Sequence, residues 1–444
     1  MRNAIPGGAH TYSRGRDQFP SNAPGILERG QGAYVWTPDG ERYLDYGMGL
    51  RSVGLGYAHA RVSERVTASI QMGTNLTLPT RLELEAAEAL IAQVSSVEMV
   101  KFAKHGSTVT TAAVKLARAA TGKQHVAVSN QHPFHSFDDW FIAATVMRRG
   151  VPPSSDLSFK FDYGDVAQLE RLLSHRRDEI AAVILEPGVG QVPCPAECGD
   201  TFRRNSACLA CDKHQRNFLV EVRRLCTKYG VVMILDEIVT GFRWHAEGAQ
   251  HMFGIEPDLT TFGKAMANGF PLAALGGRRE FMDLGSIDRS GMERTFLMSS
   301  THGSELVGLA AFLATLDVYA AEDVCGHFWR YGRDLATLWK SVASEFHVDS
   351  YITIEGPYAG QVFVARDESG NPSLEYKTLF AQEMARSGVL MPWLSPSLAH
   401  GENELRMTEN ALRRSFETYA RALEDGVSAY LEGPAVLPVF RSHN

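Results

Sequence analysis

The chain has few of the features that would suit a nucleic-acid partner or a membrane. Its 444 residues carry 44 Lys and Arg against 51 Asp and Glu, a formal net charge of -7 at pH 7, whereas phosphate backbones bind basic surfaces. No apolar run approaches the length of a membrane-spanning helix, and the segment from Met1 to Gly8 lacks the apolar core of a signal peptide. We therefore expect a cytoplasmic protein without a nucleic-acid or membrane partner.

Cysteine is scarce, and its six residues are unevenly placed. Cys226 and Cys325 stand alone in segments with a helical pattern, where free cysteine behaves as a small buried hydrophobe. The other four lie together in an insert over residues 193–214: Cys194, Cys198, Cys208 and Cys211. Two close pairs separated by a polar loop suit a structural zinc site, whereas their loose spacing also suits free or redox-active thiols. Both alternatives remain open.

Strand-like and helix-like segments alternate through most of the chain. The expected strands lie at 99–102, 125–128, 181–185 and 231–235, and the expected helices at 82–93, 108–120 and 218–229. Such alternation is typical of a mostly parallel sheet with helices on both faces. After about residue 298 the order becomes helices, then strands, then helices, which indicates a smaller α+β domain.

Two segments carry the groups of greatest chemical interest. The apolar run Val231–Leu235 ends at Asp236, which delivers a carboxylate to the carboxyl edge of a parallel sheet, where α/β proteins bind ligands. Lys264 lies on the next loop and can reach the same edge. An acid to protonate a pyridine nitrogen and a lysine to form an imine are what pyridoxal phosphate (PLP) chemistry requires. As spacing alone, the pair also fits a helix-capping carboxylate and a surface lysine.

The segment from Asp236 to Lys264, with Gly248-Ala249-Gln250 and Pro257-Asp258-Leu259-Thr260-Thr261 inside it, closely resembles the core of class III aminotransferases. Within them it is most similar to the glutamate-1-semialdehyde 2,1-aminomutase branch. The resemblance extends over nearly the whole chain and implies the α/β fold type I of PLP-dependent transferases. It also implies three parts: residues 1–60 joining the small domain, a large PLP-binding domain at 61–300, and a C-terminal small domain at 301–444.

This resemblance implies PLP as the cofactor and gives the catalytic roles to two residues. Lys264 would form the Schiff base with PLP, and Asp236 would hold the pyridine nitrogen protonated. The further cofactor-binding residues that it implies are Gly106, Ser107 and Thr108 at the phosphate, Phe134, Ile238 and Glu186 around the ring, and Thr301 at the phosphate bound by a second subunit. A site shared in this way implies a homodimer.

Simpler structural roles remain open for some of these residues. Ser107 and Thr301 also suit helix N-caps, and Phe134 also suits a place in the core. Thr108 departs from the family pattern, which usually has glutamate there. Arg14 and Arg51 are candidates to bind a substrate carboxylate, because a guanidinium group binds it through two hydrogen bonds; surface ion pairs are their alternative.

The predicted function is an aminomutase-like class III aminotransferase that moves an amino group between a small-molecule donor and acceptor. The segments Lys104–Thr108 and Ala267–Pro271 differ from those of true semialdehyde aminomutases, and the second lacks their triple glycine. Glutamate-1-semialdehyde 2,1-aminomutase itself, which shifts the group within one molecule, is therefore the alternative. An alternative from another class is a non-catalytic PLP-fold protein whose cysteines make it a metal-binding interaction module.

Overall fold

The computed structural model describes residues 1–188 and 218–443, and the four clustered cysteines lie outside these ranges. The chain forms two compact units. The small unit consists of residues 1–59 and 326–441, and the large unit contains the described residues of 60–325 and 442–444. The predicted large domain ends at residue 300, whereas in the structure helix α10 (Leu306–Ala321) packs against helices α2 and α3 and belongs to the large unit.

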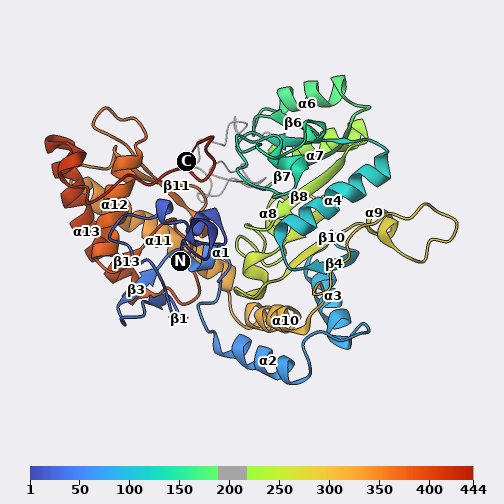
Figure 1. Ribbon diagram of the computed structural model, residues 1–444, viewed down its shortest axis with the longest axis horizontal. Helices are drawn as coiled ribbons and strands as arrows, with labels where there is room; N and C mark the ends of the chain where they lie inside the picture. The colour runs from blue at the N-terminus through green and yellow to red at the C-terminus, as the bar shows by residue number, and fades with distance from the viewer. Residues whose placement is uncertain (189–217, 444) are drawn as a thin grey trace. The chain divides into compact units, whose positions relative to one another are not determined.

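A seven-stranded sheet forms the centre of the large unit (Figure 1). Its order is β4 (Met99–Ala103), β10 (Ala273–Gly277), β9 (Leu259–Phe262), β8 (Val232–Glu237), β7 (Ile180–Leu185), β5 (His125–Ser129) and β6 (Ser158–Phe161). Strands β9, β8, β7, β5 and β6 are parallel, and β10 is antiparallel to both of its neighbours. All residues of β7 and β8 are buried, as expected for parallel strands covered on both faces. The predicted α/β fold with a mostly parallel sheet is confirmed.

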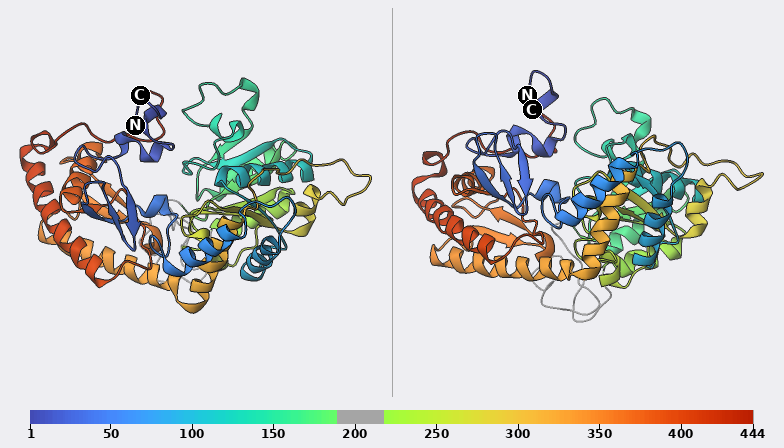
Figure 2. Two further views of the ribbon diagram at one scale, coloured as in Figure 1. Left: turned by 60° about the horizontal axis from the view of Figure 1, so that its bottom comes forward. Right: turned by 90° about the horizontal axis from the view of Figure 1, so that it is seen from below.

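Helices pack against this sheet and against one another. The helices of the large unit are α2 (Ala60–Gln71), α3 (Arg81–Gln93), α4 (Gly106–Thr121), α5 (Asp139–Ile142), α6 (Val166–His175), α7 (Phe218–Tyr229), α8 (Ala249–Phe253), α9 (Arg279–Met282) and α10. Helix α4 lies across β10, β9, β8 and β7, so that its first turn stands beside the strand ends (Figure 1). Helix α10 lies beside α2 (Figure 2). None of the helices in the described ranges has the length and hydropathy that a bilayer span requires.

The small unit combines segments from both ends of the chain. One of its sheets has the order β1 (Arg29–Gln31), β2 (Tyr34–Trp36), β3 (Arg42–Asp45) and β13 (Val389–Leu390), and β11 (Ile352–Glu355) pairs with β12 (Val362–Ala365). Its helices are α1 (Met48–Arg51), α11 (Val324–Glu345), α12 (Leu374–Arg386) and α13 (Glu402–Asp425). Trp339 centres the core, 5.1 Å from the ring of Phe380 and 5.3 Å from that of Phe416. The Trp339 indole N–H donates to the carbonyl of Ile352 at 3.1 Å.

Helix α11 lies in close contact with the backbone at Tyr358, and Gly332 is the residue that allows this contact. A Cβ atom on Gly332 of α11 would lie 1.8 Å from the carbonyl oxygen of Tyr358. We expect Gly332→Ala to lower stability by about 1–3 kcal/mol, because the backbone around Tyr358 would have to move. Gly360→Ala is the matched control, since a Cβ there would meet nothing within 4 Å. Equal melting temperatures of the two variants would contradict the contact.

Candidate active site

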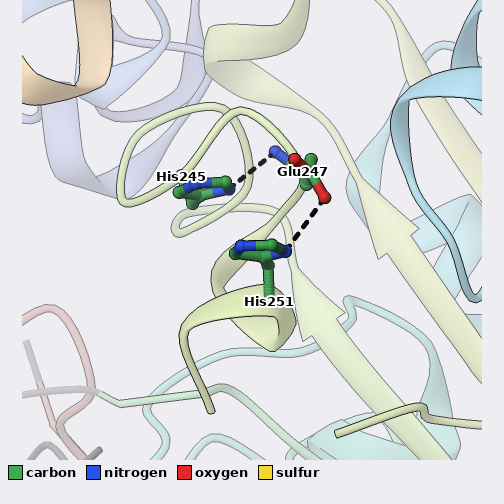
Figure 3. Close-up of side chains that lie close together, drawn as sticks. All are labelled: His245, Glu247 and His251. Carbon is green, nitrogen blue, oxygen red and sulfur yellow. Dashed lines mark hydrogen bonds and ion pairs between the residues drawn. The ribbon is translucent and has the colours of Figure 1, made fainter. Parts of the chain in front are cut away.

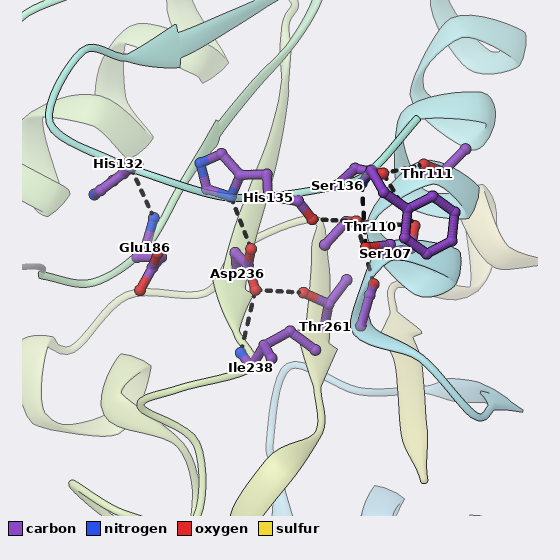
Figure 4. Close-up of polar contacts among 12 residues, drawn as sticks. Ser107, Thr110, Thr111, His132, His135, Ser136, Glu186, Asp236, Ile238 and Thr261 are labelled. Carbon is purple, nitrogen blue, oxygen red and sulfur yellow. Dashed lines mark hydrogen bonds and ion pairs between the residues drawn. The ribbon is translucent and has the colours of Figure 1, made fainter. Parts of the chain in front are cut away.

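Asp236 lies at the carboxyl edge of the large sheet and is only 3 % exposed. Its Oδ2 lies 2.7 Å from Nδ1 of His135. Its Oδ1 accepts hydrogen bonds from the Thr261 hydroxyl and from the N–H of Ile238, both at 3.1 Å (Figure 4). Asp236 and Thr261 are paired positions on the neighbouring strands β8 and β9, so the strand register brings the hydroxyl to the carboxylate. The carboxylate is thus fixed in position by three separate segments.

Two buried histidines extend this group of polar contacts (Figure 4). Nδ1 of His132 accepts a hydrogen bond from the backbone N–H of Glu186 at 3.3 Å, and the rings of His132 and His135 meet edge to face at 5.3 Å. Burial, followed by the charges of His135 and Lys160, holds the pKa of His132 well below its usual range. His132 is therefore a neutral acceptor at neutral pH.

His135 and Thr261 are functional-site residues for which the sequence patterns predict no role. His135 directly follows Phe134, for which the resemblance implies a place at the ring, and this position is the one signal that points to it. The contact of Thr261 depends on the register between β8 and β9, which no local sequence pattern specifies.

Gly106, Ser107 and Thr108 form the first turn of α4. The N-cap residue of this helix is His105, and no side chain caps it in the described structure. The first N–H groups of such a helix carry partial positive charge and suit an anion. The buried Ser107 hydroxyl accepts a hydrogen bond from the N–H of Phe137 at 3.3 Å, and the N–H of Thr108 bonds to the carbonyl of His105 at 3.1 Å. Ser107 is therefore not the N-cap that its sequence context also allowed.

Lys264 follows β9 at the start of the 3-10 turn η5 (Lys264–Ala267), and it is half-buried. Its φ of +46° lies in the left-handed region, where a residue other than glycine is strained by roughly 1–3 kcal/mol. A Cβ on the preceding Gly263 would lie 3.1 Å from Cδ1 of Ile238, and a Cβ on Gly106 would lie 3.2 Å from the same atom. The side chain of Ile238 therefore packs between the backbone before Lys264 and the first turn of α4.

The other predicted residues of the large unit lie near strand or helix ends. Phe134 is 44 % exposed and meets Phe141 edge to face at 6.1 Å, so it is not a core residue. Glu186 is buried directly after β7. Thr301 is exposed, and it does not cap α10, because the N-cap is Glu305, whose carboxylate accepts from two N–H groups of the first turn.

The two predicted arginines belong to the small unit, and Arg14 is exposed there. Arg51 ends the turn α1, in which every residue from Met48 has a positive φ, between +41° and +67°. Asp45 holds this left-handed turn by accepting from the N–H groups of Gly47 at 2.7 Å and Met48 at 3.1 Å. The guanidinium of Arg51 lies 5.9 Å from the ring centre of Trp393.

The two isolated cysteines show no sign of reactivity. Cys226 is buried, Cys325 is half-buried, and burial raises the pKa of each thiol to about 12. A thiol with so high a pKa stays protonated and is a poor nucleophile or metal ligand.

The low pKa of His132 predicts a pH effect on stability. Below about pH 6.5 the unfolded chain binds a proton at this histidine that the folded chain does not, so stability falls with pH by up to about 1.4 kcal/mol per unit. His132→Asn removes the titrating group while keeping an acceptor for the Glu186 N–H. We expect its melting temperature to fall less than that of the wild type between about pH 7.5 and pH 5. The exposed His175→Asn is the control, and parallel profiles for His132→Asn and the wild type would refute the assignment.

Comparisons with known proteins identify the family of this chain. The family model of class-III aminotransferases matches residues 16–423. A glutamate-1-semialdehyde 2,1-aminomutase of Desulfatibacillum aliphaticivorans is 29% identical over 92% of this chain and 96% of its own length. One of Nitrosomonas europaea is 35% identical over 71% of this chain and 69% of its own length. The solved structure of the Sphingopyxis sp. MTA144 FumI protein, in its PLP internal aldimine form, has a TM-score of 0.82 at 23% identity and covers 96% of this chain and 95% of its own. The chain therefore belongs to the class-III aminotransferases, a family of enzymes, and has the fold type I of PLP-dependent transferases.

Proposed function

We propose that this enzyme is a PLP-dependent, aminomutase-like aminotransferase in which Lys264 binds the cofactor covalently. The observation that carries the proposal is the buried carboxylate of Asp236, which His135 and Thr261 hold in position at the sheet edge. Among the described residues, His135 is the one basic side chain that pairs with it. A protonated pyridine nitrogen is the partner that such a carboxylate favours.

The chemistry of the surrounding donors fits the other parts of PLP. The uncapped first turn of α4, with Gly106, Ser107 and Thr108, suits the phosphate. Lys264 supplies the primary amine for the aldehyde, and Ile238 and Phe134 offer apolar contacts for the ring. Glu186 lies at the end of the neighbouring strand β7 and would face the substrate side.

When bound, PLP supplies a pyridine ring that withdraws electrons from the substrate carbon bearing the amine. Asp236 keeps the ring nitrogen protonated, because a carboxylate within hydrogen-bond reach stabilises the cation. His135 and Thr261 prevent Asp236 from rotating away. Lys264 would hold the aldehyde carbon of the cofactor through its Nζ, and the same amine, once free, would be the base that takes up and returns the proton of the substrate Cα. Enzymes of this family act on small molecules, and Arg51 or Arg14 would bind the substrate carboxylate.

Amino transfer between two molecules is favoured over the intramolecular shift of the semialdehyde aminomutases. The segment Ala267–Pro271 lacks the triple glycine expected for those enzymes. In its place Asn268 adopts φ +44° and is 7 % exposed, so a polar side chain occupies a buried position close after Lys264. The names of the relatives keep glutamate 1-semialdehyde as the alternative substrate.

A second copy of the chain would complete the site. Thr301 is exposed in this chain, as expected if it reaches the phosphate bound by a partner. Five large apolar side chains from the end of α2 to the first turn of α3 are also 52–76 % exposed: Ile70, Met72, Leu76, Leu78 and Leu84. Apolar residues concentrated in this way are typical of a protein interface. A homodimer is therefore part of the proposal, to which we add a cytoplasmic location as expected from the sequence.

The covalent role of Lys264 can be tested by absorption spectroscopy. We expect the wild type to show the near-visible band of lysine-bound PLP, Lys264→Ala to lack it, and the exposed control Lys340→Ala to keep it. Loss of the band on adding glutamate, with pyridoxamine phosphate left on the protein, would identify transfer between molecules. Formation of 5-aminolevulinate from glutamate 1-semialdehyde without another donor would identify the aminomutase instead. A wild type that stays colourless after incubation with PLP would overturn the catalytic proposal.

The shared site predicts complementation between two defective variants. Thr301→Ala should weaken PLP binding, and Lys264→Ala should abolish the band. A mixed dimer of the two has one site in which an intact Lys264 meets an intact Thr301 from the other subunit. We therefore expect co-expressed variants to regain part of the tight PLP binding and of the band. Gly106→Ala with Lys264→Ala is the control, and complementation in both mixtures or in neither would refute the role of Thr301.

A further inference from the structure

A second group of ligand-type side chains lies between β8 and the first turns of α8. His245, Glu247 and His251 meet there, and one nitrogen of each imidazole and one carboxylate oxygen lie within 4.8 Å of one another (Figure 3). Glu247 Oε2 is 2.9 Å from His251 Nδ1. The two imidazole rings are stacked, with centres 4.2 Å apart and planes inclined by 6°. The proposed amino transfer uses none of these three residues.

An ordinary ion pair explains only part of this arrangement. Glu247 and His251 are four residues apart and could form a surface pair, but the stacked ring of His245 adds a second imidazole beside the first. Neutral imidazole is the commonest metal ligand in proteins, so two such rings beside a carboxylate suit a metal ion.

We propose that His245, Glu247 and His251 bind one Zn²⁺ ion through two imidazole nitrogens and one carboxylate oxygen. Such a set is typical of zinc sites with a fourth position for water, whereas Mg²⁺ and Ca²⁺ prefer oxygen ligands. Bonds of about 2.0–2.1 Å in a tetrahedron place ligand atoms roughly 3.4 Å apart. Side-chain rotation can close the present spacing, because His251 is exposed and the other two residues are only partly buried.

Zinc binding would replace one existing hydrogen bond. Nδ1 of His245 now accepts from the backbone N–H of Glu247 at 3.1 Å. A neutral imidazole has a single nitrogen lone pair, so a ring that ligates a metal through either nitrogen cannot also accept this bond. The net contribution of one such hydrogen bond to stability is small beside that of zinc–ligand bonds.

The ligands come from both sides of the boundary between loop and helix. His245 and Glu247 precede Gly248, and His251 lies within α8. A bound ion would therefore clamp the loop that follows Asp236 to this helix. This inference does not depend on amino transfer, and zinc binding is expected whether or not PLP is present.

The test is zinc titration of the full-length, PLP-incubated protein after treatment with a chelator. Free Zn²⁺ is set with a chromogenic competitor, and Co²⁺ is used as a spectroscopic probe of tetrahedral ligation. We expect His245→Ala and His251→Ala each to weaken zinc binding tenfold or more, since loss of even an outer-shell partner costs about 10–100-fold. Glu247→Gln should have the same direction of effect. His175→Ala, at an exposed histidine outside the group, should bind as the wild type does.

Two further measurements distinguish zinc binding at this site from zinc binding by the cysteines and from misfolding of the variants. A variant in which Cys194, Cys198, Cys208 and Cys211 are all replaced by Ser should still bind the zinc ion whose affinity the two histidine substitutions lower. Zinc should raise the melting temperature of the wild type and not that of His251→Ala, since binding to the folded state stabilises it. Equal melting temperatures of the metal-free proteins would show that the variants fold. Full zinc affinity in both histidine variants, or no saturable binding by the wild type, would overturn the proposal.

Discussion

The carboxylate of Asp236 is removed from water, so the protein must supply the hydrogen bonds that water would have made. Its three partners come from a loop, from the neighbouring strand and from the residue two positions along the chain: His135, Thr261 and Ile238. This requirement fixes the register of β8 against β9 and the approach of the His135 loop to the sheet edge. A shift of β9 by one residue would turn Thr261 to the other face of the sheet and leave one carboxylate oxygen without its hydroxyl.

Close packing around Ile238 imposes a second constraint. A Cβ atom at position 106, at the start of α4, or at position 263, before Lys264, would lie only 3.2 or 3.1 Å from Cδ1 of Ile238, so glycine fits both positions without displacing this side chain. Contact with Ile238, whose N–H also donates to Asp236, therefore positions both the first turn of α4, which suits a phosphate, and Lys264. The left-handed φ of Lys264 is sustained by this packing, since an isolated lysine would leave that conformation. One segment after β8 thus links the carboxylate, the helix end and the lysine.

How much of this structure can be predicted from the sequence depends on how far apart in the chain the interacting residues lie. The strands and helices of the large unit follow from local patterns, because buried parallel strands require apolar runs. The sequence places Asp236 at the end of a strand and Lys264 on the following loop, and the resemblance to class III aminotransferases implies their catalytic roles. His135 and Thr261 could not be found in this way, since their contacts with Asp236 join positions 101 and 25 residues apart. The place of α10 in the large unit likewise depends on packing against α2 and α3, which a change of pattern near residue 298 does not reveal.

Adjacent carboxylates at the end of β8 show how one strand serves two purposes. Successive side chains of a strand point to opposite faces, so Asp236 and Glu237 have different surroundings. Glu237 accepts four hydrogen bonds, from the Thr240 hydroxyl, from the N–H groups of Ala249 and Gln250, and from the Gln250 amide. Burial raises the pKa of Glu237 to about 7, while these donors all favour the ionised form. An amide in its place would point an N–H group at some of these donors, so both carboxylate oxygens are needed as acceptors. Because Glu237 ties the strand to the first turn of α8, the loop between them is anchored at both ends.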